Sequence, residues 1–212
     1  MQISASVENL ITTEEELREM LGYPSELVQN KVVSIIDEHC ANFIDKSPFV
    51  VISTADENGF CDVSPRGDKP GFVYIINEKQ LVIPERPGNK RMDSLRNILA
   101  NGRAGLLFFI PGLKETLRVN GKAMLTKDKK LLEKMAVKGK NPLIGIVVEV
   151  EECFIHCAKA MIRSGLWNMD TWADKNDLPN AAKILLAHAN LPNATVETID
   201  KALEESYTKR LY

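Results

Sequence analysis

Between residues 48 and 157 the chain carries a series of short β-rich segments separated by turns. Some segments alternate apolar and polar residues, as strands with one buried face do, and others are continuously apolar. The segments are PFVVIST (48–54), FCDVS (60–64), FVYIIN (72–77), QLVIP (80–84), AGLLFFI (104–110), TLRVNGKAML (116–125) and LIGIVVEVEECFIHC (143–157). Because few helices come between them, the pattern predicts an antiparallel barrel.

The parts of the chain on either side of this region have helical patterns. Thr12 or Thr13, followed by three glutamates, is a helix-start signal, and a second amphipathic helix is expected from Pro24 to Ile44. Two further helices are expected near the end of the chain, and two within the β-rich region. Their ranges are 178–190, 194–212, 90–101 and 128–137.

We therefore expect one domain in three segments: a helical segment 1–46, a β-barrel core 47–157 and a helical extension 158–212. With 212 residues, 44% apolar and 26% charged, the chain has the composition of a globular protein and not of a disordered one. Its net charge of -2 gives no general attraction to nucleic acid or to anionic membranes.

The expected location is the cytoplasm. No run approaches the roughly 18 apolar residues that a membrane span requires. The first ten residues lack the basic and apolar regions of a secretory signal, so the four cysteines are expected to stay reduced.

The first candidate binding motif is SPRGD (64–68), at the end of a predicted strand. Proline and glycine on either side of Arg66 indicate a stiff turn that presents the guanidinium. The planar fork of arginine matches pairs of phosphate oxygens. The alternative is an ordinary turn in which Arg66 is solvated and has Asp68 as its partner.

The second motif is RPGNKRMDSL (86–95), in which a Pro-Gly turn leads into a helix. Asn89 is the expected N-cap, which places Lys90 and Arg91 in the first turn. Cations there oppose the helix dipole, and an anion bound at the N-terminus resolves that conflict. The alternative is that Asp93 and solvent screen the two charges.

Two polar faces are further candidates. Arg118, Asn120 and Lys122 share one face of a predicted strand, which lines a ligand groove or is simply solvated. Lys159, Arg163 and Trp167 recur every four residues, as on one face of a helix. That face suits a planar anionic ligand, or it is a solvated face with a half-buried tryptophan.

The sequence predicts no metal site. Cys153 and Cys157 point to one side of the last strand and His156 to the other, and no further ligand motif accompanies them. The sequence also contains no G-x-S-x-G, G-x-G-x-x-G or G-x-x-x-x-G-K-[ST] motif. These absences argue against serine hydrolase, Rossmann and P-loop functions.

The motifs together resemble the pyridoxamine 5'-phosphate oxidase-like family of flavin-binding split barrels. The resemblance rests on SPRGD, IPERPGNKR, DSLRNIL, GLLFFIPG, ETLRVNGKA and FIHCAKAMIRSGLW, and covers about residues 40–170. It implies a mainly β fold with flanking helices, built on a six-stranded antiparallel split β-barrel. It also implies a homodimer with FMN in each of two clefts at the subunit interface.

The resemblance further implies which residues contact the cofactor. Ser64 and Arg66 fall at the phosphate or ribityl chain, and Ile83 and Pro84 at the edge of the isoalloxazine. The basic phosphate turn is Asn89, Lys90 and Arg91, and the polar side chain near the flavin is Thr116. The group that reaches the flavin from the other subunit is His156, Lys159, Arg163 and Trp167.

The implied function is an FMN-dependent oxidoreductase that moves hydride or electrons between FMN and a small organic substrate. The sequence lacks the Arg-x-His element with which true pyridoxamine phosphate oxidases hold their substrate. Pyridoxamine phosphate is therefore not the expected substrate. Two alternatives remain: haem or deazaflavin in the same cleft, with His156 as the first haem ligand to test, or a flavin-binding or sensing protein without catalysis.

Overall fold

The computed structural model describes residues 8–212, which fall into two units. The first unit ends at Val32, and the second runs from Val33 to Tyr212. The expectation about a secretory signal lies largely on residues 1–7, outside the described part of the chain.

The first unit contains helices α1 (Glu14–Leu21) and α2 (Glu26–Asn30). Thr13 is the N-cap of α1, and its hydroxyl accepts a hydrogen bond from the Glu16 N–H at 3.3 Å. This confirms the helix-start signal. Neither helix has a buried residue, so neither has a core of its own.

The prediction of a single helix from Pro24 to Ile44 is wrong. After α2 the chain becomes extended, and Val33 and Cys153 exchange backbone hydrogen bonds of 3.1 and 2.7 Å. A helix cannot continue through such a bridge. Helix α3 (Glu38–Lys46) begins only after Asp37, whose carboxylate accepts from the Cys40 N–H.

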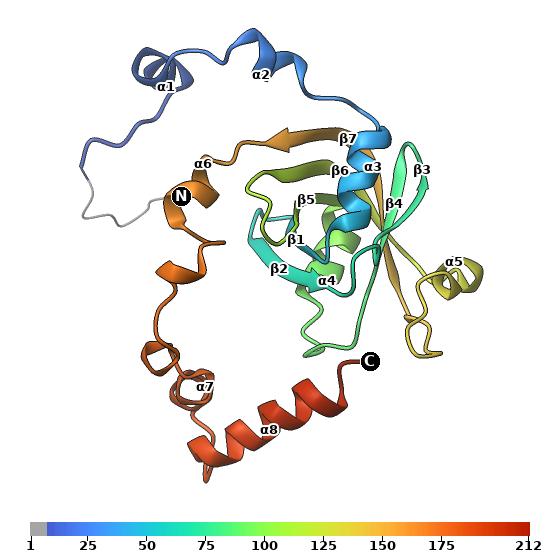
Figure 1. Cartoon of the computed structure of the whole chain (residues 1–212), viewed down its shortest axis with the longest axis vertical. Helices are drawn as coiled ribbons and strands as arrows, with labels where there is room; N and C mark the ends of the chain where they lie inside the picture. Colours follow the sequence, from blue (N-terminus) through green and yellow to red (C-terminus); the bar gives the residue numbers. More distant parts are fainter. Residues whose placement is uncertain (1–7) are drawn as a thin grey trace. The chain divides into compact units, whose positions relative to one another are not determined.

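In the described residues, the centre of the second unit is one antiparallel sheet of seven strands in the order β2-β1-β5-β6-β7-β4-β3 (Figure 1). The strands are β1 (Phe49–Ala55), β2 (Cys61–Gly67), β3 (Tyr74–Asn77), β4 (Gln80–Pro84), β5 (Arg103–Phe109), β6 (Thr116–Thr126) and β7 (Gly145–His156).

The prediction of a mainly β fold with flanking helices is confirmed, but the number of strands differs from the six that the resemblance implies. The sheet is also open, because β2 and β3 are edge strands in the described structure. Strand β2 does not stop at the SPRGD motif. It pairs with β1 as far as Gly67, so it forms a full edge strand.

One face of the sheet, together with α3 and α4 (Asp93–Asn101), forms the core. Phe43 and Ile44 enter it from α3, and Leu95 and Ile98 from α4. Strand β5 is buried on alternate residues only, although residues 104–110 are continuously apolar. Every second side chain of β5 therefore faces away from the core.

The other described helices are short or lie toward the end of the chain. They are α5 (Lys129–Glu133), α6 (Lys159–Ser164), α7 (Ala181–Ala189) and α8 (Val196–Lys209), with 3-10 turns at Met169–Thr171 and Lys175–Asp177. Thr195 and Thr198 form a capping box at the start of α8. None of the helices in residues 8–212 has the length and apolar character needed to cross a membrane.

Strands β6 and β7 are interrupted by a β-bulge. Asn120 pairs with Glu152 and Gly121 with Val150, which leaves Glu151 as the extra residue. A Cβ on Gly121 would stand 2.0 Å from the Glu149 carbonyl oxygen. Only glycine permits this close approach of the two backbones.

Candidate functional site

The first group of polar side chains lies on β2 and faces α4. Every second position of the strand carries one of them, namely Asp62, Ser64 and Arg66, so the three side chains share a face. The hydroxyls of Ser64 and Ser94 both donate to Asp62 Oδ2, at 3.1 and 2.7 Å. This shared carboxylate fixes the first turn of α4 against β2.

The prediction of a turn at SPRGD is wrong, because the first four residues of this motif belong to β2 and pair with β1. Arg66 nevertheless keeps a defined position. Its Nε donates to Glu85 Oε2 at 2.9 Å, and its Nη1 to the Pro65 carbonyl oxygen at 3.0 Å. The predicted alternative partner, Asp68, pairs with Arg86 instead, at 2.8 Å.

These two ion pairs join β2 to the segment that follows β4. The Asp68 side chain is 3% exposed and that of Arg86 is 15% exposed. Burial raises the pKa of the Asp68 carboxyl, but three partners outweigh this and hold it below the usual value. They are the Tyr212 hydroxyl, the Lys69 N–H and the charge of Arg86.

The basic turn before α4 differs from the sequence prediction. Helix α4 begins at Asp93, and its N-cap is Met92, not Asn89. Lys90 and Arg91 therefore precede the helix, and an acid occupies its first turn. The predicted conflict between two cations and the helix dipole does not arise.

The side chains around this turn leave one cation unpaired. Asn89 Oδ1 accepts from the Arg91 N–H at 3.0 Å, and Arg91 Nε donates to Asp93 Oδ2 at 2.8 Å. Within residues 8–212, Lys90 forms no ion pair, and no side chain caps α4. Lys90 and Met92 both have left-handed backbone, with φ of 62° and 61°.

Ile83 and Pro84 offer only backbone groups to a ligand, because their side chains are buried. Both residues pair with β7, at Ile146 and Gly145. Thr116 is also buried, and it lies opposite His156 in the β6–β7 pairing. The His156 ring lies 6.3 Å from the Phe154 ring, centroid to centroid.

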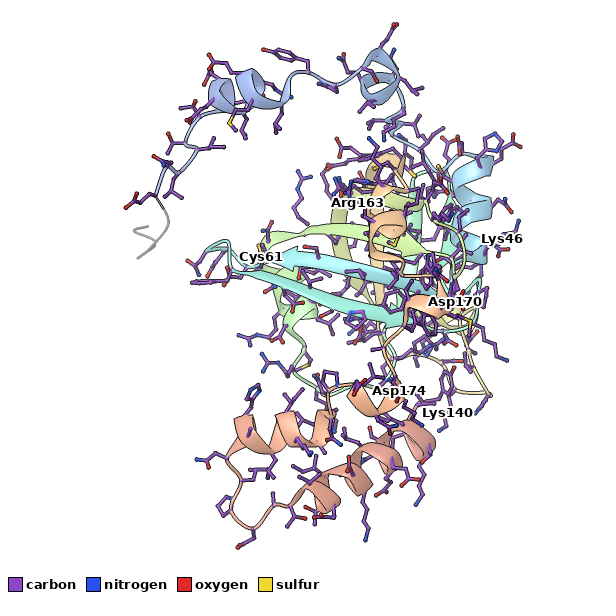
Figure 2. All side chains as sticks on the ribbon, turned by 60° about the vertical axis from the view of Figure 1, so that its left-hand side comes forward. Lys46, Cys61, Lys140, Arg163, Asp170 and Asp174 are labelled. Carbon is purple, nitrogen blue, oxygen red and sulfur yellow. The ribbon has the colours of Figure 1, made fainter. Side chains whose placement is uncertain are left out.

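The expected face of Lys159, Arg163 and Trp167 forms only in part. Lys159 and Arg163 lie on α6, and Figure 2 shows Arg163 on this short helix. The helix ends at Gly165, which has φ of 61°, so Trp167 lies outside it. The indole Nε1 of Trp167 donates to the Leu113 carbonyl oxygen at 2.9 Å.

The predicted site residues fall into two groups, one around Arg66 and the turn 85–92 and one around His156. Gly67 pairs with Phe49, Phe49 with Phe109, and Thr116 with His156. Strands β1, β5 and β6 separate β2 from β7. Arg66 instead pairs with Glu85, beside Pro84, and Pro84 pairs with Gly145, at the opposite end of β7 from His156. A single chain thus keeps the Arg66 group and the His156 group separate.

A polar hollow of about 560 Å³ lies over the β-bulge. Asn120 lines it and donates to Glu152 Oε2 at 2.8 Å, while Arg103 pairs with Glu151. Of the predicted face on β6, Arg118 lies over the Phe154 ring, 5.6 Å from its centroid. The bulge brings Glu151 and Glu152 to this hollow, which the sequence did not indicate.

Glu85 and Arg86 were also missed. The sequence signal that could have found them is an acid and a base directly after a predicted strand, which complement the Arg and the Asp two residues apart in SPRGD. Within residues 8–212, no group of three or more His, Cys, Asp or Glu side chains is placed to hold a metal ion.

Comparison with known proteins places this arrangement in a family. The family model for pyridoxamine 5'-phosphate oxidase matches residues 36–157, more than half of the chain. The chain belongs to the pyridoxamine 5'-phosphate oxidase family. The matched region begins just before α3 and ends just after β7, so it contains all seven strands of the described sheet.

The solved structures that match this member of the pyridoxamine 5'-phosphate oxidase family have low sequence identity to it. HupZ from Group A Streptococcus is 17% identical, with a TM-score of 0.46, over 57% of this chain and 93% of that chain. A protein related to general stress protein 26 from Clostridium acetobutylicum is 14% identical (TM-score 0.41; 56% and 85% covered). A pyridoxamine 5'-phosphate oxidase-related, FMN-binding protein from Nostoc punctiforme is 12% identical (TM-score 0.39; 54% and 78%). A search of curated proteins found no match.

Proposed function

We propose that this protein binds FMN and that the turn 85–92, with the N-terminus of α4, holds the FMN phosphate. The observation that carries the proposal is the exposed Lys90, which has no ion-pair partner in residues 8–212, next to Arg91 and an uncapped helix. A phosphate monoester has a charge of about -1.5 to -2 at neutral pH. Free N–H groups and cations at a helix N-terminus complement that charge.

The donor set fits a phosphate. Ammonium, guanidinium, hydroxyl and backbone N–H groups all donate hydrogen bonds to phosphate oxygens. Lys90 and Arg91 supply the charge, and Ser94 holds the first turn of α4 against β2 through Asp62. Arg66 adds a third cation close to the turn through its pair with Glu85.

We also propose that the complete site is formed by a homodimer, with FMN at the subunit interface. Support comes from the placement of the two groups of site residues, because Pro84 pairs with Gly145 and His156 lies at the opposite end of β7. Further support comes from apolar side chains left exposed on the outer face of the sheet. Val63 of β2 is 64% exposed, and Phe49 of β1 is 39% exposed. A second copy packed on this face buries them and brings its own His156, Lys159, Arg163 and Trp167 to the turn 85–92 of the first.

The proposed reaction is an oxidation or reduction of a small organic substrate. FMN, when bound, supplies hydride and single-electron chemistry. The chain's own residues bind the phosphate, orient the ring against the backbone at Ile83 and Pro84, and shield one face with the sheet. Since the sequence lacks the Arg-x-His element, the substrate is not pyridoxamine phosphate.

The test is a titration of the purified protein with FMN, followed by flavin fluorescence. The double variant Lys90→Ala/Arg91→Ala is expected to bind FMN about 100-fold more weakly, as expected when charge-assisted hydrogen bonds are lost. The matched control is Lys129→Ala/Lys130→Ala, which removes two adjacent exposed lysines at the start of α5. Equal affinity of the two double variants contradicts the phosphate site, and a wild type that takes up no FMN contradicts the function.

A further inference from the structure

Tyr212 contacts the two motifs that form the candidate phosphate site. Its hydroxyl donates to Asp68 Oδ1 at 2.8 Å. The other oxygen of this carboxylate accepts from Arg86 Nε, also at 2.8 Å. One nearly buried carboxylate thus joins Tyr212 to the segment that begins the turn 85–92.

The ring and backbone of Tyr212 are held as well. The Arg86 guanidinium lies 5.8 Å and the Lys138 ammonium 5.3 Å from the ring centroid. Lys140 Nζ donates to the main-chain oxygen of Tyr212 at 3.0 Å. Lys138 and Lys140 lie between α5 and β7, where Figure 2 labels Lys140. Three separate segments therefore converge on one residue.

These contacts distinguish Tyr212 from its neighbour on α8. Tyr207 is 61% exposed, whereas Tyr212 is partly buried. A hydrogen bond to a charged carboxylate is stronger than one between neutral groups, and a cation over an aromatic ring adds an electrostatic attraction. Together these contacts are strong enough to fix the end of the chain against Asp68 and Arg86.

The turn that follows Arg86 needs such support. Lys90 and Met92 both have left-handed backbone, which is unfavourable for residues other than glycine. Strained conformations of this kind persist when the surrounding structure holds them. In the described chain, the turn is tied to β2 at its start by the Arg66–Glu85 and Asp68–Arg86 pairs. Tyr212 binds the second of these pairs.

We propose that Tyr212 is a positioning residue, which fixes the Asp68–Arg86 pair and so keeps Lys90 and Arg91 oriented toward the phosphate of FMN. The inference rests on the proposed function. Tyr212 itself does not touch the phosphate. Its loss frees one oxygen of Asp68 and one face of the Arg86 guanidinium, which lets the turn move.

The contact depends on pH in a defined direction. The groups that face the Tyr212 side chain and backbone are Asp68, Arg86, Lys138 and Lys140. The hydrogen bond to Asp68 raises the pKa of the Tyr212 hydroxyl above its ordinary value of 10.0. The contribution of the contact is therefore complete below pH 10 and is lost as the pH rises through the raised pKa.

The first measurement is the FMN dissociation constant of Tyr212→Ala, Tyr212→Phe and the control Tyr207→Ala. We expect a weakening of about 20-fold for Tyr212→Ala and about fivefold for Tyr212→Phe, which keeps the ring but loses the hydrogen bond. Tyr207→Ala is expected to bind like the wild type. Wild-type affinity in Tyr212→Ala overturns the positioning role and leaves the proposed function intact.

The second measurement needs no cofactor. The ultraviolet absorbance of tyrosinate is followed against pH, and the wild type is compared with Tyr212→Phe to isolate Tyr212. We expect a midpoint above 10.0 that returns to the ordinary value in Asp68→Asn. An ordinary midpoint in the wild type overturns the inference. A wild type that takes up no FMN overturns the proposed function and the inference with it.

Discussion

The two groups of candidate site residues differ in how the single chain holds them. Around β2 and the turn 85–92, two cations are fixed by carboxylates from the facing segment, at 2.9 and 2.8 Å. Around β6, β7 and α6, Thr116 lies opposite His156, but Lys159, Arg163 and Trp167 do not form one face. Thr116 is buried, Trp167 binds a carbonyl oxygen, and Arg163 projects from a short helix. The first group is organised within one chain, and this contrast supports the proposal that the second acts across a dimer.

The largest expected effect comes from removing the charge of Asp68 in the first group. Asp68→Asn leaves the nearly buried Arg86 without its anion, so we expect the free energy of unfolding to fall by about 3 kcal/mol. Denaturant unfolding measures this, with Asp170→Asn as the control because Asp170 is exposed (Figure 2). A loss no larger than that of the control contradicts the view that this group is organised in the single chain.

Removing the cations of the second group tests whether this group contributes to FMN binding. Lys159→Ala/Arg163→Ala is expected to weaken FMN binding by about tenfold, less than the double variant at Lys90 and Arg91, because α6 cations act only from a second copy. Flavin fluorescence titration gives the affinity, and light scattering of the same samples gives the oligomeric state. A larger effect at α6 than at the turn reverses the proposed roles of the two groups.

Ser94→Ala removes the hydrogen bond by which α4 holds Asp62. Ser94 is buried and its hydroxyl lies 2.7 Å from Asp62 Oδ2, so we expect a loss of stability of about 1 kcal/mol. Ser53→Ala, at an exposed serine of β1, is the matched control for the denaturant measurement. Equal stability of the two variants means that this bond does not fix α4.

The smallest expected effect is on the free energy of unfolding at acid pH. Because the pKa of Asp68 lies below 3.8 in the folded protein, its contribution is complete at higher pH and is lost as the pH falls through that lowered pKa. The stability difference between wild type and Asp68→Asn should therefore shrink below pH 3.8. A difference that stays constant down to pH 2 contradicts a role for the charge of Asp68.

The sequence predicted the strands well because alternation and turn residues are local signals. Each β-rich segment from 48–54 to 143–157 overlaps one of the observed strands. Local signals failed where the backbone adopts an unusual conformation. Asn89 looked like an N-cap, but left-handed Lys90 and Met92 delay the start of α4 to Asp93.

The candidate site was predictable only in part. Lys90 and Arg91 could be identified from their clustering, whereas the partners of Arg66 and Asp68 depend on the register of distant strands. The contact of Tyr212 with Asp68 joins residues 144 positions apart. Such long-range pairs follow from the three-dimensional fold and leave no local pattern in the sequence.

The most direct test of the phosphate site compares FMN with riboflavin, which has the same ring system without the phosphate. Calorimetric titration of the wild-type protein with each ligand gives the two dissociation constants. If Lys90, Arg91 and the N-terminus of α4 hold the phosphate, FMN should bind at least about 100-fold more tightly than riboflavin. Equal affinities, or no binding of FMN, would contradict the proposed site.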